Sequence, residues 1–218
     1  MLLKMYYNSF KIKSIFFMKF SIISIQFNLE NIIKENIMKS VQPIRDIEKV
    51  QAMKNELLKT GYRNFMLFNI GINTGLRVSD ILMLKVSDVK DKRHIMIKEK
   101  KTAKNKRFLI NLNLKIDLDK YIMGMMEDEF LFKSQKGYNQ PITRVQAYRI
   151  LNEAAKKVGL TEVGTHTMRK TFGYFHYNQF KDIAILQDIF NHSSPSITLR
   201  YIGINDDMKD KTIENFYL

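Results

Sequence analysis

Four side chains in the last third of the sequence are of the types that could act together on a phosphate diester. His166 and Arg169 are three residues apart, which on a helix places both on one face. His192 and Tyr201 follow. A guanidinium can hold two phosphate oxygens, and an imidazole can move a proton near neutral pH. A phenol can be the covalent nucleophile if its proton is removed, so these groups could process a phosphodiester without a metal ion.

Arg77 is a second candidate for phosphate binding. It lies in the sequence Thr-Gly-Leu-Arg, where Gly75 is expected to end one helix and Val78 to begin the next. We therefore expect Arg77 at a buried junction between two helices. A guanidinium placed there requires an anion, either the carboxylate of Asp80 or a bound phosphate. Both interpretations, a structural ion pair and a binding site, remain open from these residues alone.

A strongly basic stretch lies between these motifs. Residues 90–107 contain nine Lys and Arg against two acidic residues, which gives +7, half of the chain's net charge of +14. Residues 94–98 and 107–111 are expected to be two strands, with a turn at 101–106. Ammonium groups on such a hairpin suit DNA phosphates, although most charge runs are ordinary solvated loops. The predicted DNA contacts are Lys98, Lys100, Lys104, Lys106, Arg107, Arg144 and Lys170.

Composition narrows the class of protein. A chain of 218 residues with 45% hydrophobic residues can bury one good core. Its pI near 9.7 favours a polyanionic partner, nucleic acid first and an anionic membrane second. The sequence has no Cys, which excludes disulfides and thiolate metal sites and fits a cytoplasmic protein. With only four His, two of them in the motif, we expect no metal and no cofactor.

The first 40 residues differ in pattern from the rest. The apolar run at 14–23 is interrupted by Lys19, is too short to span a bilayer, and is followed by no small-x-small cleavage site. Well-patterned sequence begins just after Met38. We interpret residues 1–40 as an N-terminal extension, either poorly ordered or, up to residue 37, not part of the working protein. Residues 41–218 are the expected domain.

Apolar residues at steps of three and four predict a mainly helical domain. Residues 130–132 are expected to be a short extended piece, and either Ser194 or Ser196 to cap the segment bearing Tyr201. The apolar face of the helix that Thr143 caps is expected to carry Val145, Tyr148, Leu151 and Ala155. The expected helices are 46–60, 63–73, a short one from 78, 114–126, 144–157, 166–178, 182–190 and 206–216.

Taken in order, these motifs resemble the tyrosine recombinases, the phage integrase family, over about residues 41–205. Each motif is a weak signal alone, but six at compatible spacings are a strong one. The resemblance implies an α+β fold: a mainly helical integrase-type catalytic domain with a small antiparallel sheet. By position, the catalytic residues would be Arg77, Lys101, His166, Arg169, His192 and Tyr201, with Asp80 supporting Arg77.

The resemblance also implies a mechanism. Tyr201 would attack a scissile phosphodiester of double-stranded DNA, form a 3′-phosphotyrosyl link and release a 5′-hydroxyl. The two arginines would bind the non-bridging oxygens, and His192 would add a hydrogen bond. His166 would take the phenolic proton and Lys101 would protonate the leaving oxygen. Copies of the chain are expected to associate on DNA through the helix at 206–216, in a synapse of four.

The sequence departs from the family's usual pattern at three places. Asn191 stands where Gly is common, which still permits a left-handed helix end, and Gly203 stands where many members have His. Forty residues are also too few for the separate DNA-clamping domain that typical members have before the catalytic one. Three alternatives remain: an enzyme like a type IB topoisomerase, a non-catalytic DNA-binding regulator, and a protein bound to a membrane surface through residues 1–27.

Overall fold

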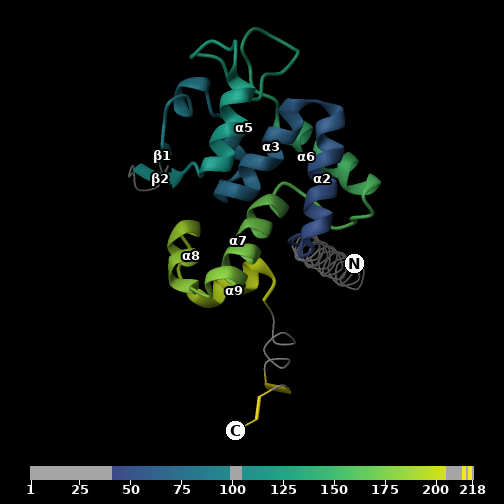
Figure 1. The fold of residues 1–218 in the computed structure, drawn as a ribbon, viewed down its shortest axis with the longest axis vertical. Helices are drawn as coiled ribbons and strands as arrows, with labels where there is room; N and C mark the ends of the chain where they lie inside the picture. The colour runs from purple at the N-terminus through teal and green to yellow at the C-terminus, as the bar shows by residue number, and fades with distance from the viewer. Residues whose placement is uncertain (1–40, 99–104, 205–212, 215, 218) are drawn as a thin grey trace, which may run out of the picture. The chain divides into compact units, whose positions relative to one another are not determined.

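The computed structural model describes residues 41–98, 105–204, 213, 214, 216 and 217. Within this part the chain is mainly helical, with one two-stranded antiparallel sheet (Figure 1), which confirms the predicted fold class. None of the described helices is long and apolar enough to cross a membrane. The elements in order are α2 (Ile47–Thr60), α3 (Tyr62–Thr74), α4 (Val78–Leu82), a 3₁₀ turn (Val86–Asp88), β1 (His94–Lys98), β2 (Asn105–Leu109), α5 (Leu112–Ile122), α6 (Arg144–Lys157), α7 (Thr167–Phe180), α8 (Ile183–Phe190) and α9 (Pro195–Ile202).

The larger core lies among α2, α3, α5 and α6. Helix α3 is its centre: most of its residues are buried, and it packs against α2, α5 and α7. Helix α2 begins where predicted, because the Asp46 side chain accepts a hydrogen bond from the backbone N–H of Glu48 at 2.8 Å. Figure 1 shows α7 leading from this group to a second one, formed by α8 and α9.

Helix α6 confirms one prediction and corrects another. Thr143 and Gln146 form a capping box, so the helix begins where the sequence indicated. Its predicted apolar face is wrong in part, since Val145 is 58% exposed and Tyr148 is 48% exposed. The face that enters the core is a stripe of small residues and one leucine, spaced by three and four, which turns those two side chains outward. Its buried members are Ala147, Leu151, Ala154 and Ala155.

The first strand of the basic hairpin lies at 94–98 as predicted, but the second strand is shifted from its predicted position. Strand β2 begins at Asn105 and pairs in register with β1, so that Lys98 faces Asn105. Residues 105 and 106 are therefore strand residues and not part of the turn; residues 101–104 lie outside the described part of the chain. Asn111 is not in a strand, because its side chain accepts from the N–H of Leu114 and caps α5. Helix α5 consequently begins two residues earlier than predicted, and it ends at Ile122.

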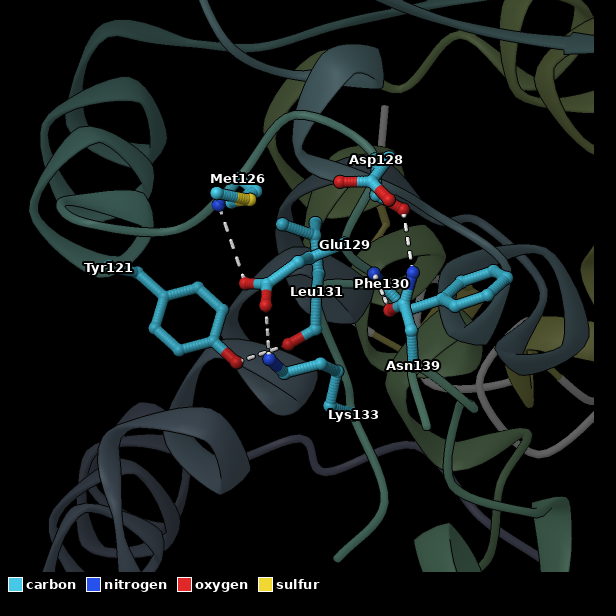
Figure 2. A network of polar contacts seen from close by, with 8 residues as sticks. All are labelled: Tyr121, Met126, Asp128, Glu129, Phe130, Leu131, Lys133 and Asn139. Atoms are coloured by element: carbon cyan, nitrogen blue, oxygen red, sulfur yellow. Dashed lines mark hydrogen bonds and ion pairs between the residues drawn. The ribbon is translucent and has the colours of Figure 1, made fainter. Parts of the chain in front are cut away.

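The loop after α5 is held by polar contacts (Figure 2). The Tyr121 hydroxyl donates to the carbonyl of Leu131, and burial raises the pKa of this phenol to about 12, so the hydroxyl keeps its proton. Asn139 donates to the carbonyl of Asp128 and accepts from the N–H of Phe130, each at 3.0 Å. In the predicted extended piece at 130–132, Phe130 forms an isolated β-bridge with Lys85, and the next two residues lie in a turn. These contacts hold the loop against α5.

A second, smaller core lies under α8 and α9. Leu186, Phe190 and Ile202 are fully buried there. A side chain at Gly173 of α7 would come within 2.6 Å of Ile202 and 2.7 Å of Phe190, so only glycine permits this close approach. Asp182 caps α8 and Ser194, one of the two predicted serines, caps α9. Most of the predicted helix at 206–216 lies outside the described residues.

Candidate active site

Tyr201 lies in the last turn of α9, facing His166 at the start of α7. Its hydroxyl oxygen is 3.3 Å from Nδ1 of His166, and the two rings are nearly perpendicular. His166 is the N-cap of α7 and not an interior helical residue, which corrects the prediction. Its backbone is nevertheless in the right-handed helical region, and its carbonyl accepts from the N–H of Lys170 at 2.9 Å. An imidazole at this distance could accept the phenolic proton.

His192 also lies against the Tyr201 ring. The ring centroids are 5.1 Å apart, and Nδ1 of His192 is 3.0 Å from the Thr198 hydroxyl. Asn191 ends α8 with a φ of 52°, so it adopts the left-handed conformation that was predicted for it. Thr198 was missed in the sequence, although its position three residues before Tyr201 places it on the same side of a helix. Its hydroxyl engages one imidazole nitrogen, Nδ1 of His192.

Arg169 is the most deeply buried charged group of the site, with only 5% of its surface exposed. One terminal nitrogen donates to the carbonyl of Phe190 at 2.9 Å, and the other donates to the carbonyl of Gly75. Its guanidinium carbon also lies 4.3 Å from the centroid of the Phe190 ring. Burial lowers its pKa to about 10, so Arg169 is still charged at neutral pH. Through these two hydrogen bonds, Arg169 connects Gly75, just before Arg77, with Phe190, just before His192.

Arg77 is exposed, and the prediction of a buried junction is wrong. It is the N-cap of α4, and its neighbours Leu76 and Val78 on either side enter the core, which turns the arginine side chain outward. Among the described residues, no ion pair joins Arg77 to Asp80; the Asp80 carboxylate accepts from the hydroxyl of Ser79 instead. The purely structural explanation of Arg77 therefore has no support in the described contacts.

Gly75 has two reasons to be glycine. Its φ is 67°, in the left-handed region that closes α3. A Cβ atom there would lie 2.5 Å from the Phe172 ring of α7. The sequence suggested only the first reason. The close approach brings the carbonyl of Gly75 within reach of Arg169, and so places the Arg77 segment beside α7.

Positive charge from several elements acts on the three titratable groups of the site. Burial raises the pKa of Tyr201, and the nearby charges of Arg169 and Arg77 act in the opposite direction. His166 is exposed at the surface, but its partial desolvation lowers its pKa, and the cations Lys170 and Arg144 lower it further. Burial also lowers the pKa of His192. Both imidazoles are therefore neutral at pH 7, the form in which an imidazole accepts a proton.

The predicted DNA contacts fall into three groups. Lys100 and Lys104 lie outside the described residues, as does Lys101, which was predicted to be catalytic. Lys98, Arg107 and Arg144 are exposed. Lys106 and Lys170 are partly buried, since the Lys106 amino group contacts Asp188 of α8 and the Lys170 amino group donates to the carbonyl of Val41 at 2.7 Å. Lys170 also lies 5.3 Å from the centroid of the Tyr201 ring, so it borders the site itself.

A sequence profile of the phage integrase family matches residues 45–208, about three quarters of the chain. The chain belongs to this family, as the order of its motifs predicted, and its fold is that of a tyrosine recombinase catalytic domain. The probable integrase/recombinase YoeC of Bacillus subtilis is 55% identical over 170 residues, which cover 78% of this chain and 93% of YoeC. Tyrosine recombinase XerH of Campylobacter jejuni is 27% identical over 180 residues, which cover 80% of this chain.

Solved structures agree at the level of the fold. The crystal structure of XerA recombinase superposes with a TM-score of 0.66 at 21% identity, covering 82% of this chain and 67% of that one. A post-cleavage complex of XerH site-specific recombinase with a palindromic difH substrate gives a TM-score of 0.64, covering 78% of this chain and 51% of that one. The chain thus spans nearly all of YoeC, but only about half of XerH.

Proposed function

We propose that this chain is a site-specific DNA recombinase that cuts and rejoins strands through a 3′-phosphotyrosyl intermediate. The observation that carries the proposal is the position of the Tyr201 hydroxyl, 3.3 Å from Nδ1 of His166, in a site bordered by Arg169, Arg77 and His192. A phenol beside a neutral imidazole and two guanidinium groups suits attack on a phosphodiester. The probable integrase/recombinase YoeC, which is 55% identical to this chain, supports the same activity.

The residues divide the reaction among them. The Tyr201 oxygen attacks phosphorus, its proton passes to His166, and the 5′-oxygen leaves with a proton from Lys101. Arg169 donates to two backbone carbonyls, which leaves three of its five N–H groups for phosphate oxygens. Another 5′-hydroxyl reverses the step and displaces Tyr201. The phosphotyrosyl link conserves the energy of the broken bond and guanidinium groups supply positive charge, so the proposal includes neither a nucleotide nor a metal ion.

A trapping experiment tests this proposal. The purified chain is incubated with nicked duplexes, one set drawn from the DNA that flanks its gene and one set randomised around the nick. A short fragment with a 5′-hydroxyl diffuses away after cleavage and leaves the protein attached, through the phosphate, to the 3′ end of the labelled upstream strand. We expect a covalent adduct on a denaturing gel, and sequencing of the trapped DNA should give the preferred site. Binding to both sets without any adduct would favour the non-catalytic regulator instead.

A second assay separates recombination from topoisomerase activity. A plasmid with two copies of the trapped site should be converted into recombinant products, whereas a plasmid without the site should stay supercoiled. Relaxation of both plasmids at equal rates would favour the alternative that resembles a type IB topoisomerase. We also propose a cytoplasmic location, because the partner is DNA and the sequence has no Cys.

Replacing Lys101 with Ala should slow cleavage of ordinary DNA by roughly 10²–10⁴, the usual contribution of a general acid. A substrate with sulfur in place of the bridging 5′-oxygen has a leaving group of lower pKa and needs no proton. The Lys101→Ala variant should therefore cleave this substrate at nearly the wild-type rate in single-turnover measurements. Lys104→Ala is the matched control. If Lys104→Ala shows the rescue and Lys101→Ala does not, the general acid is Lys104.

We propose DNA contacts by the exposed side chains Lys98, Arg107 and Arg144, and by Lys100 and Lys104 in the undescribed part of the hairpin. Lys106 and Lys170 have contacts within the protein, so their contribution to DNA binding depends on releasing or sharing those contacts. Residues 41–218 are proposed as the catalytic domain. A chain shortened to begin at Met38 should still form the adduct; loss of the adduct would contradict this division.

We further propose that the chain is monomeric in solution and that four copies form a synapse on DNA through residues 206–216. Ile213, Phe216 and Tyr217 support this idea, because these apolar side chains are exposed and available to a neighbouring copy. Deleting residues 207–218 should preserve folding and binding to a single site but abolish pairing of two sites. Sedimentation of the shortened protein with DNA measures this, and a complex of unchanged stoichiometry would rule the idea out.

A further inference from the structure

The segment before α2, residues 41–45, runs along α7 beside the active site. The backbone N–H of Ile44 donates to the Thr171 hydroxyl at 2.9 Å, and this contact is buried. The carbonyl of Val41 accepts from the Lys170 amino group. Both partners are on α7, in the turn that follows Arg169. The segment is thus fixed to the helix that carries the catalytic arginine, before the chain enters α2.

The last residue of this segment reaches the end of the helix that carries Tyr201. The Arg45 guanidinium donates to the carbonyl of Gly203 at 3.3 Å and to the side-chain oxygen of Gln42 at 3.2 Å. It also lies 5.8 Å from the centroid of the Tyr174 ring of α7. A Cβ atom at residue 203 would come within 2.5 Å of the Arg45 guanidinium, so the fit is close. This contact therefore connects Arg45 with Gly203, which lies 158 positions further along the sequence.

Helix α9 is held by its buried residues Thr198 and Ile202 and by contacts at its ends. It has only eight residues, too few for a helix to be stable in water by itself. Its C-terminus is a Schellman motif: the N–H of Gly203 donates to the carbonyl of Arg200, and the N–H of Ile204 donates to that of Leu199. Tyr201 is the last residue but one of this helix. Any shift of the Gly203 peptide therefore moves the nucleophile relative to His166.

We propose that Arg45 is a positioning residue for Tyr201, which acts by holding the carbonyl of Gly203 and with it the last turn of α9. This proposal rests on the proposed function, since it assigns a role in the same reaction. Lys170 completes the connection, because its amino group binds Val41 and lies 5.3 Å from the centroid of the Tyr201 ring. The segment at 41–45 thus contacts the C-terminal end of the helix that bears Tyr201 and, through Lys170, the Tyr201 ring.

The alternative role for an exposed arginine in a basic protein is a direct contact with a DNA phosphate. The two roles differ in what they change. A phosphate contact contributes to DNA affinity and to its salt dependence. A positioning residue acts on the chemical step in the DNA-bound complex, and on the mobility of α9 in the free protein. Cleavage at saturating DNA, the dissociation constant and amide exchange together distinguish them.

Arg45→Met keeps the length of the side chain and removes the donor. We expect single-turnover cleavage of the trapped substrate to slow by about tenfold at saturating DNA, with the dissociation constant unchanged within twofold. In the protein without DNA, amide hydrogens of residues 202–204 should exchange several times faster, while those of α2 and α6 should not change. Arg45→Lys should recover most of the cleavage rate, because an ammonium group can also donate to the Gly203 carbonyl.

Lys49→Met is the matched control. Lys49 belongs to the same part of the chain and donates to the carbonyl of Val158, at the far end of α6 from the site. This variant should leave cleavage and exchange in α9 at wild-type values. Arg45→Met with normal cleavage and normal exchange, or with a loss confined to DNA affinity, would overturn the proposal. If the wild-type protein forms no adduct, the proposed function fails, and the exchange measurement still decides whether Arg45 holds α9.

Discussion

Replacing Tyr201 with Phe will abolish the covalent adduct and leave DNA binding within about twofold of wild type. The ring packs against Phe190 and His192, with centroids 5.4 Å and 5.1 Å away, and phenylalanine keeps this packing. The substitution removes only the nucleophilic oxygen and its 3.3 Å approach to His166. Adduct on a denaturing gel and the dissociation constant of the complex, measured on the same substrate, give the two results.

Tyr217 provides the control. It is 98% exposed, so Tyr217→Phe should form adduct at the wild-type rate. An adduct that persists in Tyr201→Phe but disappears in Tyr217→Phe would show that the nucleophile is misassigned. The two substitutions remove the same atom from the same residue type. Their comparison therefore separates the chemistry at position 201 from any general effect of losing a phenol.

The titration of the site explains why the nucleophile needs its neighbours. Burial raises the pKa of the Tyr201 phenol, so the free protein holds this group protonated at neutral pH. Burial and the surrounding cations lower the pKa of His166, so its imidazole is neutral and can accept a proton. In the proposed reaction, proton transfer between them becomes favourable as negative charge develops on the phosphate and is stabilised by the two arginines.

Most helices could be placed from the sequence because local signals determine where a helix begins. Asp46, Thr143 and Ser194 each accept a hydrogen bond from the first turn of the helix that follows them, as their residue types indicated. Such caps involve residues two or three apart, so they are visible in the sequence itself. The rotation of a helix about its axis is different, because it depends on what packs against it. That is why the apolar face of α6 was predicted wrongly.

The members of the candidate site were predicted from chemistry and order, but their contacts were not. Arg77 follows the short loop after α3, and whether its side chain points inward depends on which of its neighbours the core accepts. Nothing in the sequence distinguishes Thr198 from the other threonines, because its contact with His192 forms only where α8 ends in the folded chain. The contact of Arg45 with Gly203 joins distant segments, and no local pattern predicts it.

Arg169 has a role in the structure as well as its proposed role in the chemistry, and this affects how its substitution is interpreted. Two of its N–H groups bind the carbonyls of Gly75 and Phe190, which lie on separate segments. Lysine keeps the charge but has no planar fork, so it cannot hold both carbonyls and a phosphate at once. Because the side chain at position 169 is largely buried, Arg169→Lys should leave at least one buried carbonyl without a hydrogen-bond donor. The loss of this hydrogen bond should lower the free energy of unfolding.

Arg169→Lys should therefore lose cleavage by roughly 10²–10³, the usual effect of removing one donor to a developing oxyanion. The protein should also melt at a lower temperature, so cleavage is measured well below the melting point of the variant, at saturating DNA. Arg200→Lys is the matched control, since Arg200 is an exposed arginine on α9 next to Tyr201, and it should cleave normally. Cleavage by Arg169→Lys within about threefold of wild type, in protein shown to be folded, would remove Arg169 from the set of phosphate-binding residues.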